Sequence, residues 1–94
     1  MAKADDTTDD DGLALSFGRR LAELREIAGI DGTELGRRAH VWRLEAGRAV
    51  PNLRTMARIA VALDVSLSAL VADVDCSSVE LRNRDYVRHK PVRS

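Results

Sequence analysis

The large apolar residues of this chain recur at helical spacing, and no segment alternates apolar and polar residues as a half-buried strand does. The first stripe follows the positions i, i+4, i+7 and i+11 and consists of Phe17, Leu21, Leu24 and Ala28. Such a stripe must be buried against other helices. Because the chain has only 94 residues, the pattern predicts one small all-α domain of four to five helices.

Capping residues divide this pattern into separate helices. Asp31 and Glu34 have the spacing of a capping box, in which each side chain accepts a hydrogen bond from the backbone of the other residue. Pro51 cannot continue a helix, so a new one begins after it. The expected N-caps are Ser16, Asp31, Asn52 and Ser66, and the expected helix ends are Gly29 and Asp64.

Charge is distributed unevenly along the chain. Five of the fifteen acidic residues lie between Asp5 and Asp11, whereas the part from Leu13 onward carries fourteen Lys and Arg against ten Asp and Glu. Like-charge repulsion and the lack of apolar residues predict a disordered acidic tail at residues 1–12, ahead of a folded domain at residues 13–72. This tail is either a solubilising segment or a competitor with nucleic acid for the basic body.

A basic extension is expected at residues 73–94, where five Lys and Arg, all of them after Leu81, face four Asp and Glu. Three roles are open for it: a solvated extension, a dimerising or docking segment that uses Val79, Leu81, Tyr86 and Val87, or an arm that binds nucleic acid.

Several kinds of function find no support in the sequence. The single Cys76 and the histidines His40 and His89 are too far apart for a local zinc motif. The chain has no recognisable nucleophile–base pair, carboxylate cluster or glycine-rich phosphate loop. No apolar run approaches the roughly 20 residues of a membrane span, and the first residues lack the order of a signal peptide. We therefore expect a cytoplasmic protein that is not an enzyme and that uses no cofactor, metal or membrane.

Blocks of residues in a fixed order resemble the Xre/Cro-type helix-turn-helix repressors, which are lambda-repressor-like proteins. The blocks are residues 17–25, 29–31, 34–35, 43–48 with Pro51, and 59–66 with Leu70. The resemblance covers roughly residues 16–72. It implies a five-helix domain whose second and third helices form the DNA-reading unit, with the third helix in the major groove. It also implies a nucleoid-associated regulator of transcription that binds double-stranded DNA.

The resemblance assigns roles to individual residues. Arg25 and Glu45 match a pair that joins the first helix to the end of the recognition helix, and we interpret this pair as structural. Arg48 and Asn52 match positions at which the family contacts phosphate. Trp42 lies among arginines and would suit a nucleic-acid backbone, the alternative being a place in the core or in an interface. The expected DNA contacts are Arg37, Arg38, Trp42, Arg43, Arg48 and Asn52.

The chain departs from this family between the second and third helices. Glu45 follows Leu35 by ten positions, about five fewer than is usual for such a unit. The sequence suggests that the turn and the first turn of the recognition helix are missing, so sequence reading is expected to be impaired. Residues 33–46 can fuse into one rod of about 20 Å, which we expect. Alternatively, the chain breaks near His40 and keeps a single-turn third helix.

A fused rod would carry apolar residues on two sides, which predicts a homodimer that covers the second side. The function expected from these features is a dimeric DNA-binding regulator of the repressor or antitoxin type. The alternative is a protein-interaction module that keeps the repressor fold and pairs with a related regulator or a toxin, without specific DNA binding.

Overall fold

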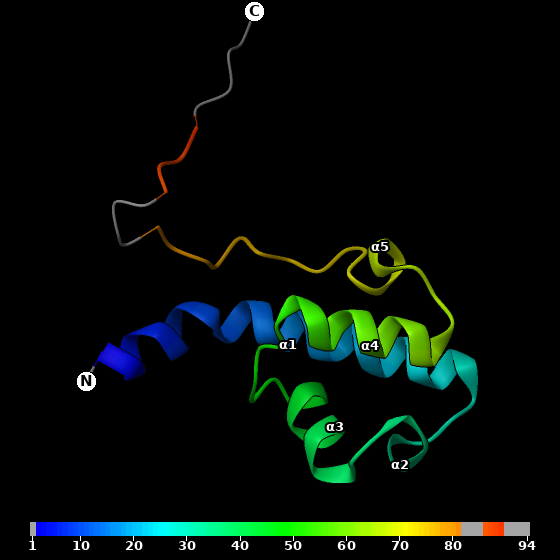
Figure 1. Cartoon of the computed structure of the whole chain (residues 1–94). Coiled ribbons are helices and arrows are strands. Elements are labelled where there is room, and N and C mark those ends of the chain that lie inside the picture. The colour runs from blue at the N-terminus through cyan, green and yellow to red at the C-terminus, as the bar shows by residue number, and fades with distance from the viewer. Residues whose placement is uncertain (1, 82–85, 90–94) are drawn as a thin grey trace, which may run out of the picture.

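The computed structural model describes the backbone of residues 2–81 and 86–89, and side chains from residue 12 onward. Within these residues the chain is all-helical, as the sequence predicts (Figure 1). The helices are α1 (Ala2–Ala28), α2 (Gly32–Leu35), α3 (Arg38–Glu45), α4 (Leu53–Leu63) and α5 (Leu67–Leu70). None of them combines the length and the apolar character that crossing a bilayer requires.

Helix α1 begins at Ala2, well before the start expected at Ser16. Ser16 is therefore not an N-cap: its hydroxyl accepts a 2.8 Å hydrogen bond from the N–H of Asp75, which ties the segment after α5 to α1. Residues 2–12, for which the sequence predicts disorder, form the first turns of this helix. The helix ends as predicted, with Gly29 at φ +75°.

The other capping residues act as the sequence predicts. Asp31 accepts hydrogen bonds of 2.9 and 3.1 Å from backbone N–H groups of α2, and the Glu34 carboxylate accepts one from the N–H of Asp31. Asn52 and Ser66 cap α4 and α5 through their side-chain oxygens. Asp64 ends α4 in the left-handed conformation, with φ 58°. These short-range hydrogen bonds set most of the helix boundaries.

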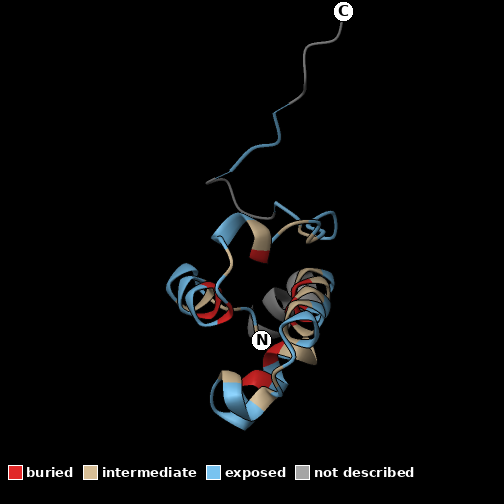
Figure 2. Cartoon of the chain, turned by 90° about the vertical axis from the view of Figure 1, so that its right-hand side faces the viewer, coloured by how far each residue is buried: buried red, intermediate tan, exposed pale blue. Residues whose placement is uncertain are grey.

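The core forms where α1, α3, α4 and α5 face one another, and Figure 2 shows the buried residues on these inner sides. Its buried members are Phe17, Leu21, Leu44, Ile59, Ala60, Leu63 and Leu70. Helices α1 and α3 approach closely at Gly18, where an added Cβ would lie 2.5 Å from the carbonyl oxygen of Leu44. Only glycine permits this contact, which fixes the end of α3 on α1.

Helices α2 and α3 are not fused, so the expected rod is wrong. Leu35 ends α2, and Gly36 and Arg37 connect it to α3 in extended conformations. On a straight rod, Leu35 would point away from Val41 and Leu44. The bend brings Leu35 against the same core in which Val41 and Leu44 are buried. Packing these three apolar side chains against one core therefore favours a break in the helix at Gly36.

The break also lies earlier than His40, the alternative site that the sequence suggested. Helix α3 has eight residues, so it is longer than a single-turn stub, whereas α2 has only four and buries none of them. Of the two helices α2 is thus the short one, and α3 is helical from Arg38 onward.

Beyond α5 the described residues 71–81 and 86–89 form neither helix nor strand. Most basic residues of the expected extension, Arg82, Arg84, Lys90 and Arg93, lie outside the described residues, and the roles proposed for the extension stay predictions.

Candidate nucleic-acid interface

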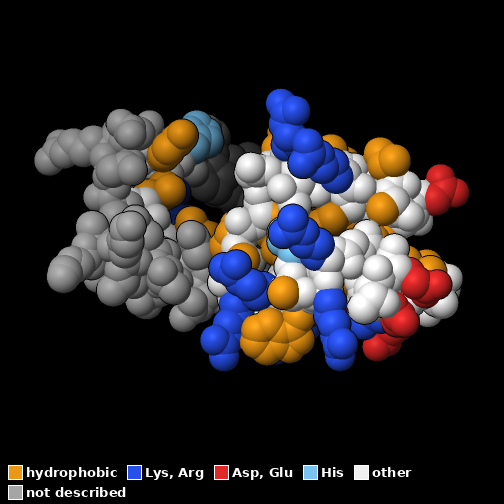
Figure 3. Space-filling model, turned by 60° about the horizontal axis from the view of Figure 1, so that its bottom comes forward, with side chains coloured by type: hydrophobic (Ala, Val, Ile, Leu, Met, Phe, Trp, Pro, Cys, Tyr) orange, Lys and Arg blue, Asp and Glu red, His pale blue; other side chains and the backbone are white. Residues whose placement is uncertain are grey.

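Helix α3 turns one side to the core and the other to solvent. Val41 and Leu44 are buried, while Arg38, Trp42 and Arg43 are exposed. Figure 3 shows Lys and Arg side chains gathered around hydrophobic ones on this face of the molecule. We call the exposed set Arg37, Arg38, Trp42, Arg43 and Arg48 the α3 face.

Trp42 does not lie in the core, because 57% of its surface is exposed. The guanidinium carbon of Arg48 lies over its ring, 5.5 Å from the centroid, which is a cation–π arrangement. The fold thus brings Arg48, which follows α3 in the sequence, back onto the helix. Trp42 and Arg48, both expected to contact DNA, therefore lie side by side on the surface.

Asn52 is exposed but already has a structural role. Its side-chain oxygen accepts a 2.8 Å hydrogen bond from the N–H of Thr55 at the start of α4. Only its NH₂ group is therefore left to donate to a phosphate.

The ion pair between Arg25 and Glu45 joins α1 to the last residue of α3. Arg25 Nε donates to Glu45 Oε2 at 2.6 Å and Nη2 donates to Oε1 at 3.1 Å, while Nη1 donates to the carbonyl of Ile30 at 2.9 Å. Both side chains are only 19% exposed. The hydrogen bond to Glu45 raises the pKa of the Arg25 guanidinium above its ordinary value. The pair anchors α3 and neutralises its only carboxylate.

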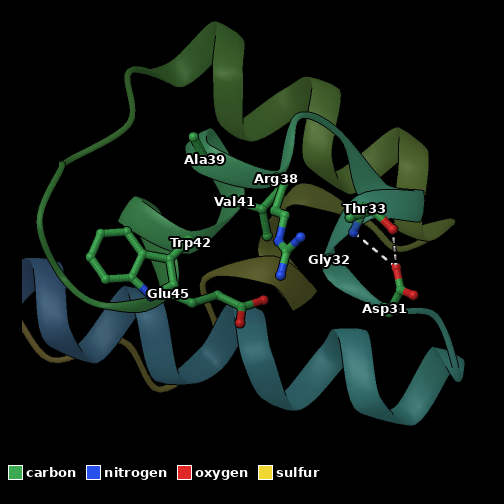
Figure 4. Close-up of a pocket in the computed structure, with 8 residues that line it drawn as sticks. All are labelled: Asp31, Gly32, Thr33, Arg38, Ala39, Val41, Trp42 and Glu45. Atoms are coloured by element: carbon green, nitrogen blue, oxygen red, sulfur yellow. Dashed lines mark hydrogen bonds between the residues drawn. The ribbon is translucent and has the colours of Figure 1, made fainter.

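A hollow separates α2 from α3, and Figure 4 shows Arg38 extending into it above Glu45. Its lining consists of Asp31, Gly32, Thr33, Arg38, Ala39, Val41, Trp42 and Glu45. Hydrogen bonds from the Thr33 hydroxyl and from the backbone of Glu34 hold the pKa of Asp31 below its ordinary range. Both carboxylates of this hollow already have partners, Asp31 in the capping box and Glu45 on Arg25. These two carboxylates therefore serve structure, and no three His, Cys, Asp or Glu side chains of the described chain gather as metal ligands.

Charge on the α3 face has one sign. Residues 37–48 contain four arginines and one glutamate, and that glutamate is paired with Arg25 from α1. Arg37 precedes α3 without capping it through its side chain. A helix that offers arginines and N-terminal N–H groups suits the phosphates of a nucleic acid.

Sequence reasoning missed Arg58 on α4. Arg58 borders a second hollow together with His40 of α3 and Leu35 of α2, so a cation of α4 lies near both of these helices. Nothing in the local sequence marks this residue, because its proximity to His40 arises only from the packing of α4 against α2.

Comparison with known proteins agrees with this geometry. A helix-turn-helix domain family matches residues 16–73, which is more than half of the chain and includes all five helices at least in part. No curated protein and no solved structure gives a significant match. The matched residues include the Arg25–Glu45 pair, the break between α2 and α3, and the whole α3 face. The chain therefore belongs to the helix-turn-helix domain family.

Proposed function

We propose that this protein is a transcriptional regulator that binds double-stranded DNA through the α3 face. The observation that carries the proposal is the unbalanced positive charge of this face, on the second helix of a helix-turn-helix unit. Arg43 and Arg48 are exposed, while the only carboxylate of α3 is held by Arg25. Such a surface attracts the phosphate backbone and releases its counterions on binding.

We propose that this protein discriminates poorly between DNA sequences. The sequence by itself attributes this to a missing start of the recognition helix, whereas the structure points to the short α2. Helix α3 begins at Arg38, so the turn that we propose to face the bases is helical. The weak element is α2, a single turn without a buried residue. In a helix-turn-helix unit the first helix crosses the backbone and holds the second in the groove. A short α2 offers few such contacts, so α3 is less firmly oriented on the bases.

We further propose that the protein acts as a homodimer of the repressor or antitoxin type. Support comes from α4, which exposes a row of apolar residues at i, i+4 and i+8: Leu53, Ala57 and Val61. Val61 is 80% exposed, a position that a second copy would cover.

Alanine substitutions at Arg43 and Arg48 test the DNA-binding proposal. Each is expected to lower the slope of log affinity against log salt by about 1 if its side chain neutralises one phosphate. Arg19→Ala is the matched control, because Arg19 is an exposed arginine of α1 outside the α3 face. The measurement is a fluorescence anisotropy titration of labelled duplex over a salt series. Absence of duplex binding at low salt would overturn the proposal and favour the protein-interaction module.

Deleting residues 1–12 tests the role of the acidic segment. If its aspartates compete with DNA for the α3 face, the deletion is expected to tighten binding several-fold at low salt and to have little effect at high salt, where exposed charges are screened. The same titration measures it. Changing the five aspartates to asparagine in the full-length chain separates charge from helix length. Equal low-salt affinities of all three proteins would leave the segment as a solubilising one.

A further inference from the structure

The α3 face contains apolar surface in the middle of its positive charge. Trp42 is more than half exposed, and Ala39, one helical turn earlier, is exposed as well. At 100° per residue the two share the side of α3 that points away from Val41 and Leu44. An aromatic ring in water loses the favourable free energy that burial would provide. This position therefore suits a ring that is covered when the protein binds its partner.

The fold holds this ring in place from one side. After α3 the chain turns at Gly47, whose φ of +74° is left-handed, and the N–H of Arg48 donates a 2.8 Å hydrogen bond to the carbonyl of Arg43. This backbone bond ties Arg48 to α3 and sets its guanidinium over the indole at 5.5 Å. Trp42 is thus oriented before any ligand arrives, with one ring face covered by a cation.

The chemistry of the major groove limits what an indole there can contact. Base edges in this groove present hydrogen-bond donors and acceptors, apart from the 5-methyl group of thymine. The hydrocarbon surface of Trp42 and Ala39 cannot pair with the polar groups of guanine or adenine. It can pack against a methyl group, while the surrounding arginines contact phosphate.

We propose that Trp42 and Ala39 select thymine by packing against its 5-methyl group in the major groove, with Arg48 as the residue that positions the indole. This rests on the proposed function, since it requires α3 to enter the groove of duplex DNA. The charge of the neighbouring arginines favours a polyanion, and the helix-turn-helix family argues for duplex DNA as the occupant.

Replacing thymine by uracil tests this directly, because it removes the methyl group and leaves base pairing unchanged. The probe is a duplex selected by the wild-type chain from a random pool, made once with thymine and once with uracil throughout. Affinity is expected to fall about fourfold for each contacted methyl group, the value of one buried methylene-sized group. Trp42→Ala is expected to lose most of the thymine preference, with only the smaller contribution of Ala39 left, and to keep the wild-type salt slope. Because the side chain is exposed, this variant should fold, which thermal melting checks.

Fluorescence gives a second and independent signal, since Trp42 is the only tryptophan of the chain. Its emission is expected to shift to the blue or to be quenched when the thymine duplex binds. Arg48→Lys keeps the charge but loses the flat guanidinium. This variant is expected to retain the salt slope, while both the thymine preference and the change in emission become smaller. A merely electrostatic Arg48 would leave these two signals unchanged.

The possible failures are distinguishable. Binding of the duplex with equal affinity for thymine and uracil, and no change in Trp42 emission, would overturn the thymine proposal and leave DNA binding intact. Absence of duplex binding would overturn the proposed function itself. Tighter binding of single-stranded oligo-dT than of the duplex would also overturn the proposal, because the ring would then stack on unpaired bases.

Discussion

Changing Glu45 to alanine is expected to lower the free energy of unfolding by about 2 kcal/mol, because it leaves the charge of Arg25 in a largely buried site without its partner. Arg25 would lose both hydrogen bonds to Glu45 and keep only the one to the carbonyl of Ile30. For a domain of this size the loss corresponds to a fall in Tm of roughly 10 °C. Urea denaturation and thermal melting measure it.

The chain offers a matched control for this change. Glu23 forms an ion pair with Arg20 at 3.0 Å, but its side chain is 59% exposed. Glu23→Ala is therefore expected to cost less than about 0.5 kcal/mol, as exposed pairs usually do. Removing both charges of the anchored pair, in an R25M/E45L variant, is expected to recover part of the loss. Equal Tm values for Glu45→Ala and wild type would show that the pair does not hold α3 in solution.

Lengthening α2 is expected to raise both DNA affinity and sequence discrimination on the order of tenfold, the range of one good base or backbone contact. The variant carries five helix-forming residues, Ala-Glu-Lys-Ala-Ala, between Leu35 and Gly36. The physical reason is the hollow where α2 ends, which an additional helical turn would fill. Its lining consists of Leu35, Gly36, His40, Val41, Leu44, Thr55, Arg58, Ile59 and Ala62. A longer α2 would also reach the phosphate backbone and steady α3 in the groove.

The same five residues inserted after His40 provide the control. That position lies inside α3, so the insertion would displace Val41 and Leu44 from the core and is expected to lower both stability and DNA binding. Competition titrations with selected and scrambled duplexes measure both variants. The reverse result, with discrimination gained only by the insertion after His40, would mean that the deficit lies in the recognition helix, as the sequence by itself suggests.

Sequence and structure place the missing residues differently, because the spacing of two residues does not tell where between them the chain is shortened. Counting from Leu35 to Glu45 reveals how many residues are absent, but any position between them satisfies the count. Helix propensity does not decide the matter, because Gly36 is the only interior weak point and a helix tolerates one glycine at a cost of about 1 kcal/mol. Burying Val41 and Leu44 while Leu35 packs against the same core outweighs this cost, and the break falls at Gly36.

The start of α1 is a second case in which a local signal was insufficient. Ser16 has the chemistry of an N-cap, yet it lies inside the helix and accepts a hydrogen bond from the N–H of Asp75, 59 positions away. A hydroxyl can accept from any nearby N–H, so its residue type alone does not tell which partner it takes.

The sequence by itself determined the features that depend on neighbours within one helical turn. These are the capping box of Asp31, the caps at Asn52 and Ser66, and the left-handed positions at Gly29 and Asp64. Such hydrogen bonds and backbone conformations form between residues close in sequence, so a short pattern contains all that specifies them.

Only the tertiary structure decided where α2 ends, that Trp42 faces solvent beneath Arg48, and that Arg58 and His40 line the same hollow. Each of these depends on which side of a helix the shared core covers. That choice is made by burying apolar residues from all the helices at once, and no single segment contains the information.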